Sequence, residues 1–202
     1  MKKRKLEMLL EQVRGFDAPD VRREQYATPA VVASELLYFA YMNGDLGGSV
    51  ADLGCGTGVL AIGAGLLGTK KVIGVDSDIR ALKTARKNAS QLDVDIAWVC
   101  CDVRDFCGRF DTVIMNPPFG AQEKGNDRPF LEKALEIGTA IYTIHNAGSA
   151  DFVRGLIDGR GTINDIATLK FPIRHTFKFH TKEIEYIDVE LYRIISNENI
   201  IR

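Results

Sequence analysis

The amino-acid sequence predicts an α/β fold whose mostly parallel sheet closes in an antiparallel hairpin near the C-terminus. Short apolar runs of strand length alternate with helical segments, which is typical of parallel strands joined by right-handed crossovers. The last two strand-like runs, 163–173 and 185–195, are separated only by a polar loop. We therefore expect these two runs to pair as a hairpin.

A single domain is expected over residues 1–202, because the sequence contains no internal repeat, low-complexity stretch or linker. Hydrophobic residues make up 46 % of the chain, which is enough to bury a core. The net charge of −1 excludes a polycation that coats nucleic acid indiscriminately. Any contact with nucleic acid must therefore come from local patches.

Two helices are expected before the first strand. Apolar residues recur at helical spacing from residue 2 to residue 13. Thr28 followed by Pro29 is typical of a helix start, with Thr28 as the N-cap. The apolar run 31–42 continues from there as the second helix.

The elements that follow alternate regularly. Strands are expected over residues 50–53, 71–76, 95–100, 111–115 and 140–144, which with the hairpin makes a seven-stranded sheet. Helices are expected over residues 59–67, 78–92, 129–137 and 150–157. Asp127 is available to cap the helix that begins at Pro129. The helix over 78–92 is expected to bury Ile79, Leu82, Ala85 and Ala89.

The four cysteines, Cys55, Cys100, Cys101 and Cys107, include no Cys-x-x-Cys pair. We therefore expect neither a metal site nor a disulfide framework, and instead expect buried, reduced thiols in a cytoplasmic protein. The charged N-terminus lacks the apolar core of a signal peptide, and no apolar run approaches the ~20 residues of a membrane span. No membrane association is expected.

A glycine-rich loop over residues 54–58 follows the first strand and precedes a helix. Glycines let the backbone approach a ligand closely at a helix N-terminus. The next strand ends at Asp76, where a carboxylate can bind two ribose hydroxyls. The spacing G-x-G-x-G differs from the dinucleotide fingerprint G-x-G-x-x-G, which argues against a nicotinamide-dependent oxidoreductase.

Three acidic residues, Asp52, Asp76 and Asp102, lie at the ends of three successive strands. Ligands of parallel sheets bind at this carboxyl edge, so we expect all three side chains in one crevice. Asp102 can accept a hydrogen bond from the amino group of an adenine, and Val103 can offer its backbone N–H. Three carboxylates repel a pyrophosphate and attract a cation.

The strand at 111–115 runs into the loop Asn116-Pro117-Pro118-Phe119. Proline cannot continue a strand ladder, and the residue before each proline is itself restricted, so this loop is stiff. Stiff loops at strand ends are frequent sites of chemistry.

These motifs resemble those of a known fold family. Residues 52–58, with Asp76 and Asp102, resemble the S-adenosylmethionine (SAM) site of Rossmann-like class I methyltransferases. Residues 116–119 resemble the catalytic loop of the members that methylate exocyclic amines. The resemblance implies SAM, a cationic sulfonium, as the cofactor.

Methylation of an exocyclic amine requires its lone pair, which is delocalised into the aromatic ring. Two acceptors that bind both N–H bonds can free that lone pair, and the Asn116 side-chain oxygen and the Pro117 carbonyl are expected to be these acceptors. Pro117 and Pro118 hold the carbonyl fixed. Phe119 can stack on a base that has left its duplex or comes from a single strand.

Over its whole length the chain resembles the archaeal and eukaryotic small-subunit ribosomal RNA (rRNA) adenine-N6 methyltransferases, the methyltransferase-like protein 5 group. The resemblance includes residues 24–29, 177–180 and 187–190. It implies that the helical extension over residues 1–45 covers the cofactor site. Cofactor contacts are expected at Gln25, Thr28, Asp52, Gly54, Gly56, Thr57, Val59, Asp76, Asp102 and Val103. Thr57 stands where eukaryotic members have Cys, and Ala27 where they have Pro.

The family also implies an RNA adenine as substrate and, in eukaryotes, a small zinc-binding activator subunit. His145, at the end of the fifth strand, is expected beside Asn116, where it can contact the base or a phosphate; a purely structural role is the alternative. Lys178 and His180 belong to a basic segment with interleaved aromatics, which suits single-stranded nucleic acid, although a solvated hairpin loop explains it too.

Other acceptors remain open within the same chemistry, namely guanine N2, cytosine N4 and the side chain of a protein glutamine. Protein-glutamine enzymes usually have Tyr where this chain has Phe119, and usually carry a separate substrate-recognising domain. A catalytically idle RNA-binding module is a further alternative, and the intact loop over residues 116–119 argues against it.

Overall fold

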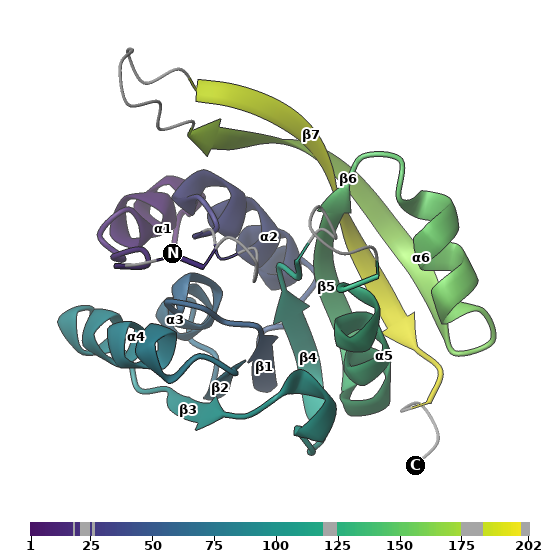
Figure 1. Ribbon diagram of the computed structural model, residues 1–202, viewed down its shortest axis with the longest axis horizontal. Coiled ribbons are helices and arrows are strands. Elements are labelled where there is room, and N and C mark those ends of the chain that lie inside the picture. The colour runs from purple at the N-terminus through teal and green to yellow at the C-terminus, as the bar shows by residue number, and fades with distance from the viewer. Residues whose placement is uncertain (18, 21–24, 26, 119–124, 175–183, 199–202) are drawn as a thin grey trace.

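The computed structural model describes residues 1–17, 19–20, 25, 27–118, 125–174 and 184–198. Within these residues the strands form one sheet in the order β3-β2-β1-β4-β5-β7-β6 (Figure 1). They are β1 (Ser49–Leu53), β2 (Lys71–Asp76), β3 (Ala97–Cys100), β4 (Phe110–Met115), β5 (Gly138–Asn146), β6 (Gly161–Arg174) and β7 (Ile184–Ser196). Strands β1 to β5 are parallel, and β7 runs antiparallel to both β5 and β6. The predicted mostly parallel sheet with a closing hairpin is confirmed.

The ends of two strands differ from the prediction because of their pairing. β5 extends to Asn146, beyond the predicted 140–144, since β7 pairs with it from Ala140 to Asn146. β3 begins only at Ala97, because its register with β2 starts at the pair Ile73 and Ala97. An edge strand has one neighbour, so it extends only as far as its hydrogen bonds to that neighbour.

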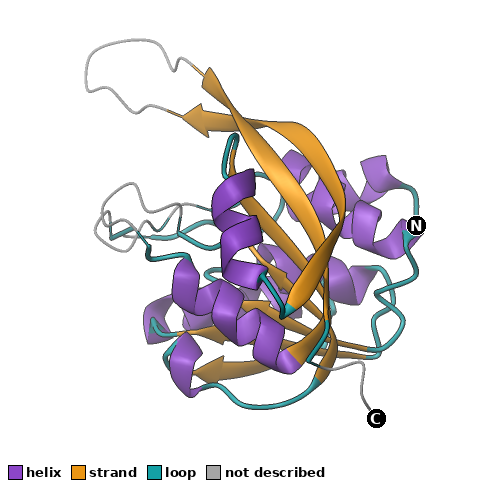
Figure 2. Ribbon diagram, turned by 90° about the vertical axis from the view of Figure 1, so that its right-hand side faces the viewer, coloured by secondary structure: helices purple, strands orange, loops and turns teal. Residues whose placement is uncertain are grey.

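Helices cover both faces of the sheet (Figures 1 and 2). They are α1 (Lys3–Leu10), α2 (Ala30–Met42), α3 (Val59–Leu66), α4 (Ile79–Gln91), α5 (Arg128–Ile137) and α6 (Ala150–Ile157). One apolar cluster packs helices α1, α2, α3 and α4 against one face of the sheet. A second cluster packs α5 and α6 against the opposite face. Between β3 and β4 the chain forms only a short 3-10 turn, η2 (Val103–Asp105).

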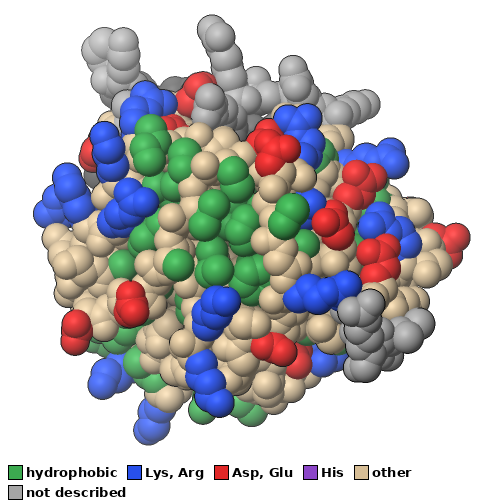
Figure 3. Space-filling view, turned by 90° about the horizontal axis from the view of Figure 1, so that it is seen from below, with side chains coloured by type: hydrophobic (Ala, Val, Ile, Leu, Met, Phe, Trp, Pro, Cys, Tyr) green, Lys and Arg blue, Asp and Glu red, His purple; other side chains and the backbone are tan. Residues whose placement is uncertain are grey.

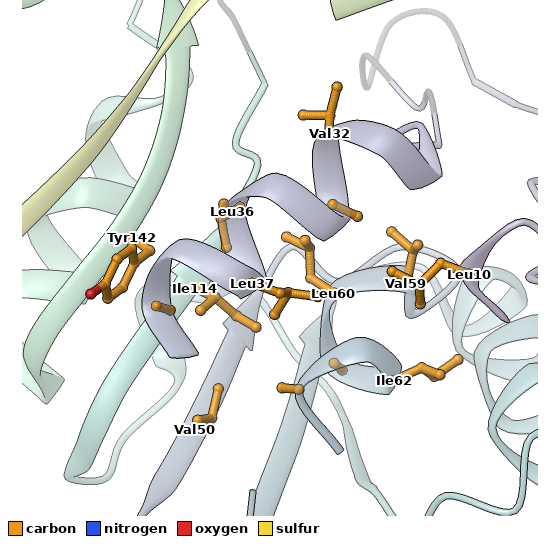
Figure 4. Packing of buried hydrophobic residues seen from close by; sticks show 14 of the residues in the cluster. Leu10, Val32, Leu36, Leu37, Val50, Val59, Leu60, Ile62, Ile114 and Tyr142 are labelled. Carbon is orange, nitrogen blue, oxygen red and sulfur yellow. The ribbon is translucent and has the colours of Figure 1, made fainter. Parts of the chain in front are cut away.

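The first cluster holds the N-terminal helices on the sheet. Leu36 and Leu37 of α2 are fully buried, and Leu37 lies next to Leu60 of α3 (Figure 4). Ile114 of β4 and Tyr142 of β5 approach the same helix from the sheet. Truncating such a buried leucine to alanine costs about 2–5 kcal/mol. This packing fixes the start of α2, and therefore Thr28 and Pro29, which directly precede it.

Several predictions about side chains on helices are wrong. Thr28 is not the N-cap of α2, because Pro29 occupies that position without a side-chain capping bond. Asp127 occupies the N-cap position of α5, as predicted, but its side chain makes no capping bond. Ile79 of α4 is 44 % exposed, and Ala81 takes the buried place instead. Thr28 was misassigned because its side chain bonds to Asn116, a distant part of the chain, which short-range spacing cannot reveal.

The cysteines also depart from the expectation. Cys55 is buried, but Cys100 and Cys107 are exposed, so the prediction of buried thiols is wrong for these two. Cys100 ends the edge strand β3, and Cys107 lies in the loop that follows η2. A chain segment at the edge of a sheet has few elements available to cover it.

The hairpin formed by β6 and β7 is longer than the sheet to which it belongs. β7 pairs with β5 only from Val189 to Ile195, so its residues 184–188 pair with β6 alone. Since Val189 lies opposite Asn146, the last residue of β5, the hairpin projects beyond the carboxyl ends of the parallel strands (Figure 2). It therefore extends on the side of the molecule where ligands of parallel sheets bind.

The opposite edge of the sheet is β3. The face that Figure 3 views from below, where β2 and β3 lie in Figure 1, has hydrophobic side chains gathered at its centre and charged ones around them. An edge strand is open to pairing with another chain, and an apolar face is a candidate contact surface. None of the described helices is long and apolar enough to cross a membrane.

Candidate active site

A cavity of about 410 Å³ lies at the carboxyl ends of β1, β2, β3 and β4. Predicted cofactor residues that line it are Gln25, Thr28, Gly54, Gly56, Thr57, Val59, Asp76, Asp102 and Val103. Asn116 and Pro118 of the predicted catalytic loop line it as well. One cavity thus joins the glycine loop, three strand ends and the segment that precedes α2.

The glycine loop forms one wall of this cavity and requires glycine at two positions in particular. Gly56 has φ +53°, and a Cβ there would lie 2.8 Å from the ring of Phe16. Gly58, with φ +89°, is the N-cap of α3, and a Cβ there would lie 2.7 Å from the ring of Trp98. A side chain at either position would be strained and would collide with one of these rings. Glycine at both positions lets the loop backbone lie close to the cavity.

Asp76 shapes the loop from the end of β2. One of its carboxylate oxygens accepts a hydrogen bond from the Gly56 N–H at 2.8 Å, and the other accepts from the Asp78 N–H at 2.8 Å. The carboxylate also lines the cavity. A carboxylate oxygen can accept more than one bond, so Asp76 can hold the loop and still bind a ribose hydroxyl.

Asp102 lies at the adenine end of the predicted site, but it carries its own counter-charge. Its carboxylate accepts bonds from Arg104 Nε at 2.8 Å and Arg104 Nη2 at 2.7 Å. The hydrogen bonds from the Arg104 side chain lower the pKa of Asp102 to about 2. The carboxylate is therefore ionised at neutral pH and is balanced by a guanidinium that also lines the cavity.

Asp52 was expected in the crevice, and this placement is wrong. The residue is 1 % exposed and is not among those that line the cavity. One carboxyl oxygen accepts from the Ala61 N–H of α3 at 2.9 Å, and the other has no partner among the described residues. Burial raises the pKa of Asp52 to about 8, so the group is mostly protonated at neutral pH. The three full negative charges inferred from the sequence are therefore an overestimate.

This shift makes protein stability depend on pH in a direction opposite to that of a salt-bridged aspartate. Folded Asp52 titrates near pH 8, whereas its ordinary value is 3.8. Between these values the folded state binds more protons than the unfolded state, so the free energy of unfolding falls as pH rises. The slope reports the difference in bound protons between the folded and unfolded states, and we expect Asp52→Asn to reduce this difference by about one. The measurement is urea denaturation between pH 5 and pH 8.

Asp95→Asn, at an exposed position before β3, is the matched control, and we expect it to keep the wild-type slope. An unchanged slope in Asp52→Asn would contradict the assignment.

Asn116 is the most unusual group in the cavity. Its side-chain Nδ2 donates a hydrogen bond to the Thr28 hydroxyl at 2.9 Å, whereas its Oδ1 is buried without a partner among the described residues. A buried polar atom without a partner costs about 1–3 kcal/mol. Such an atom beside a cavity is suited to a ligand that brings a donor, here an N–H group.

The rest of the predicted loop divides between the cavity and its surroundings. Pro118 lines the cavity, whereas Pro117 is buried and is not among the lining residues. Phe119 lies outside the described residues, as do Lys178 and His180. Their predicted contacts with a base or with RNA stay predictions.

His145 does not have the open position that was expected. It is 2 % exposed and is not among the cavity-lining residues. Its Nε2 lies 3.0 Å from the Thr143 hydroxyl, and its Nδ1 lies 3.4 Å from Asp127 Oδ2. The ring packs edge-on against Tyr192. The structure therefore favours the structural role, in which His145 anchors the residue before α5.

Sequence reasoning missed several residues of the cavity, among them Phe16, Phe130 and Arg104. Phe16 lies against Gly56, and Phe130 of α5 lies against Gly54, so two aromatic rings flank the glycine loop. Arg104 was missed as the partner of Asp102. The pattern Asp-x-Arg at a strand end was a usable signal for the ion pair, whereas neither phenylalanine belongs to a recognisable motif.

The comparisons with known proteins all identify methyltransferases as similar proteins. The family model described as methyltransferase small domain matches residues 31–140. The zebrafish protein named rRNA N(6)-adenosine-methyltransferase METTL5 is 37 % identical over 203 residues, covering 96 % of this chain and 98 % of the relative. The Drosophila melanogaster protein named rRNA N(6)-adenosine-methyltransferase Mettl5 is 34 % identical, covering 96 % of both chains.

A solved structure is similar over nearly the whole fold. It is a Pyrococcus horikoshii protein described as a candidate RNA methyltransferase, 42 % identical with a TM-score of 0.89. The similarity covers 97 % of this chain and 98 % of that one.

Proposed function

Since this chain belongs to the methyltransferase small-domain family, and within it to the rRNA N6-adenosine methyltransferases, we propose that it methylates the N6 amine of an adenine in small-subunit rRNA. The cofactor of this family is SAM, which supplies an electrophilic methyl group on a sulfonium. The observation that carries the proposal is the buried, unpartnered Oδ1 of Asn116 at the edge of the cavity.

The residues of the cavity fit this cofactor. The cavity volume of about 410 Å³ is within the range of small-molecule sites. We propose that Asp76 binds the ribose hydroxyls, that Asp102 and Val103 bind the adenine, and that Gln25 and Thr28 lie at the methionine end. Gly54, Gly56, Thr57 and Val59 form the wall between these ends. Asp52 supports the helix behind that wall through its bond to Ala61, rather than through a ligand contact.

The catalytic step is assigned to the loop over residues 116–119. Asn116 Oδ1 accepts one N–H bond of the target amine, and the Pro117 carbonyl accepts the other. With both N–H bonds held, the nitrogen would become more tetrahedral and its lone pair would be freed for reaction. SAM, when bound, would supply the methyl group, and the amine proton would be lost to water. Both acceptors are fixed before the reaction begins, so little reorganisation is needed.

RNA would reach the cavity along the carboxyl edge of the sheet. The hairpin formed by β6 and β7 projects on this side, and Tyr186 on it is 58 % exposed. An exposed aromatic on a projecting hairpin suits an unpaired base. We propose the basic segment over residues 170–182, which includes Lys178 and His180, as the continuation of this surface.

We also propose a small zinc-binding partner, as in the eukaryotic part of the family. The exposed edge of β3 and the apolar face in Figure 3 support it, because a partner strand can add to such an edge and cover such a face. This surface is separate from the projecting hairpin, which lies at the other end of the sheet. The partner would therefore leave the RNA surface accessible.

The test is incubation of the purified chain with small ribosomal subunits and SAM that carries a labelled methyl group. We expect the label in N6-methyladenosine after digestion of the RNA to nucleosides. Label in N2-methylguanosine, N4-methylcytidine or protein would favour the corresponding alternative acceptor. Repeating the assay with and without a candidate partner subunit shows whether activity needs one.

A further inference from the structure

We infer that Thr28 is a positioning residue, whose hydroxyl orients the amide of Asn116 according to what the cavity contains. The inference rests on the proposed function, since it concerns the group assigned to hold the target amine. It adds a link between the cofactor side of the cavity and the substrate side.

The two ends of an asparagine amide have nearly the same shape but opposite hydrogen-bonding character. With Oδ1 toward the target amine, Asn116 accepts an N–H bond, as the proposed reaction requires. With Nδ2 toward it, the amide would present a donor to a donor and repel the amine. The orientation of Asn116 therefore decides whether the site is competent.

Thr28 is the described residue that bonds to this amide. Its hydroxyl accepts from Asn116 Nδ2 at 2.9 Å, which leaves Oδ1 free for a ligand. The two residues are 88 positions apart in the sequence and line the same cavity. Truncation of the hydroxyl would leave the amide without this restraint.

A hydroxyl can either accept or donate, so Thr28 alone does not select one orientation. If Thr28 donated to Asn116 Oδ1, the amide would be in the wrong orientation. The competent orientation of the Asn116 amide is selected only if the Thr28 hydroxyl donates its proton to another acceptor in the cavity. The α-carboxylate of the cofactor is an acceptor of that kind, and a hydroxyl that donates to it can only accept from Asn116.

The segment that carries Thr28 is tied down at both ends of its path over the cavity. Gln25 donates from its side chain to Asp78 Oδ2, at 3.1 Å, beyond the end of β2. Thr28 bonds to Asn116, beyond the end of β4. β1 lies between these two strands, so Gln25, Ala27 and Thr28 form a strap across the cavity above β1.

The buried helix α2 follows this strap directly, and it limits how far Thr28 can move. The hydrogen bonds from the Arg80 side chain lower the pKa of Asp78, so the anchor of Gln25 stays ionised. The position of the hydroxyl is thus set by the fold, while the direction of its hydrogen bond is set by the ligand.

Thr28→Val, which keeps the shape and removes the hydroxyl, tests the inference against Thr28→Ser, which keeps the hydroxyl. At saturating SAM we expect kcat to fall at least about tenfold in Thr28→Val and to stay within about twofold of wild type in Thr28→Ser. Thermal unfolding of both variants shows whether the fold is retained. Wild-type kcat in Thr28→Val, or equal losses in the two variants, would overturn the inference.

A second measurement does not depend on methyl transfer. The side-chain amide signals of Asn116, identified by their loss in Asn116→Ala, are followed by NMR with two probes. S-adenosylhomocysteine carries the α-carboxylate, and 5′-methylthioadenosine lacks it. We expect only the first probe to shift these signals, and only when Thr28 has its hydroxyl. Equal responses to both probes would refute the coupling.

The two proposals fail separately. An amide that responds as expected in a chain that does not methylate RNA leaves the orientation mechanism standing and removes the proposed function. RNA methylation that continues at the wild-type rate in Thr28→Val leaves the proposed function standing and removes the orientation mechanism.

Discussion

Replacing Asn116 by alanine is expected to lower kcat for methyl transfer by about 10²–10³-fold, the loss typical of removing one preorganised polar group from an active site. The substitution deletes the buried Oδ1, which has no partner among the described residues and is therefore available to a ligand. Binding of SAM should change much less, because the proposed role of the deleted atom is to hold the target amine. Single-turnover methylation of rRNA, together with calorimetry of SAM binding, separates the two effects.

Asn146→Ala is the matched control, since Asn146 is exposed at the end of the neighbouring strand β5. We expect it to keep wild-type kcat. If Asn116→Ala binds SAM normally and also methylates at the wild-type rate, the amine is not held by this side chain.

Replacing Asp76 by alanine is expected to weaken SAM binding by about 100-fold, close to 3 kcal/mol. The loss has two sources. The ribose would lose a charged acceptor, and the glycine loop would lose the bonds that Asp76 accepts from Gly56 and Asp78. The measurement is the dissociation constant of SAM or S-adenosylhomocysteine by calorimetry.

Asp95→Ala removes an exposed carboxylate that precedes β3, away from the cavity, and should leave this constant unchanged. Gly56→Ala provides a second comparison. It would distort the loop through its positive φ and the contact with Phe16, but it keeps the carboxylate. Unimpaired binding in Asp76→Ala would mean that the ribose lies elsewhere.

Much of the fold could be predicted from sequence because the hydrophobic period is a local property. The run Lys71–Asp76 is one strand in both the prediction and the structure, and the helix Ala150–Ile157 agrees at both ends. The order of glycines and acidic residues located the cavity for a similar reason, since strand ends of a parallel sheet meet at one edge.

The errors concern side chains whose partners are far away in the sequence. Thr28 has the sequence signature of a helix cap but bonds to Asn116, and His145 looked accessible but is buried against Asp127 and Tyr192. Asp52 looked like a ligand carboxylate, whereas its burial behind the glycine loop raises its pKa. In each case the residue type could be read from the sequence, but the burial and the partners of its side chain could not.

The sequence by itself determined the order of strands and helices, the glycine loop that lines the cavity and the loop that carries Asn116. These depend on the spacing of residues a few positions apart. Only the tertiary structure decided which carboxylates carry charge, which histidine is buried and which hydroxyl bonds to Asn116. Those properties depend on solvent exclusion and on contacts between distant segments, and both arise only when the chain has packed.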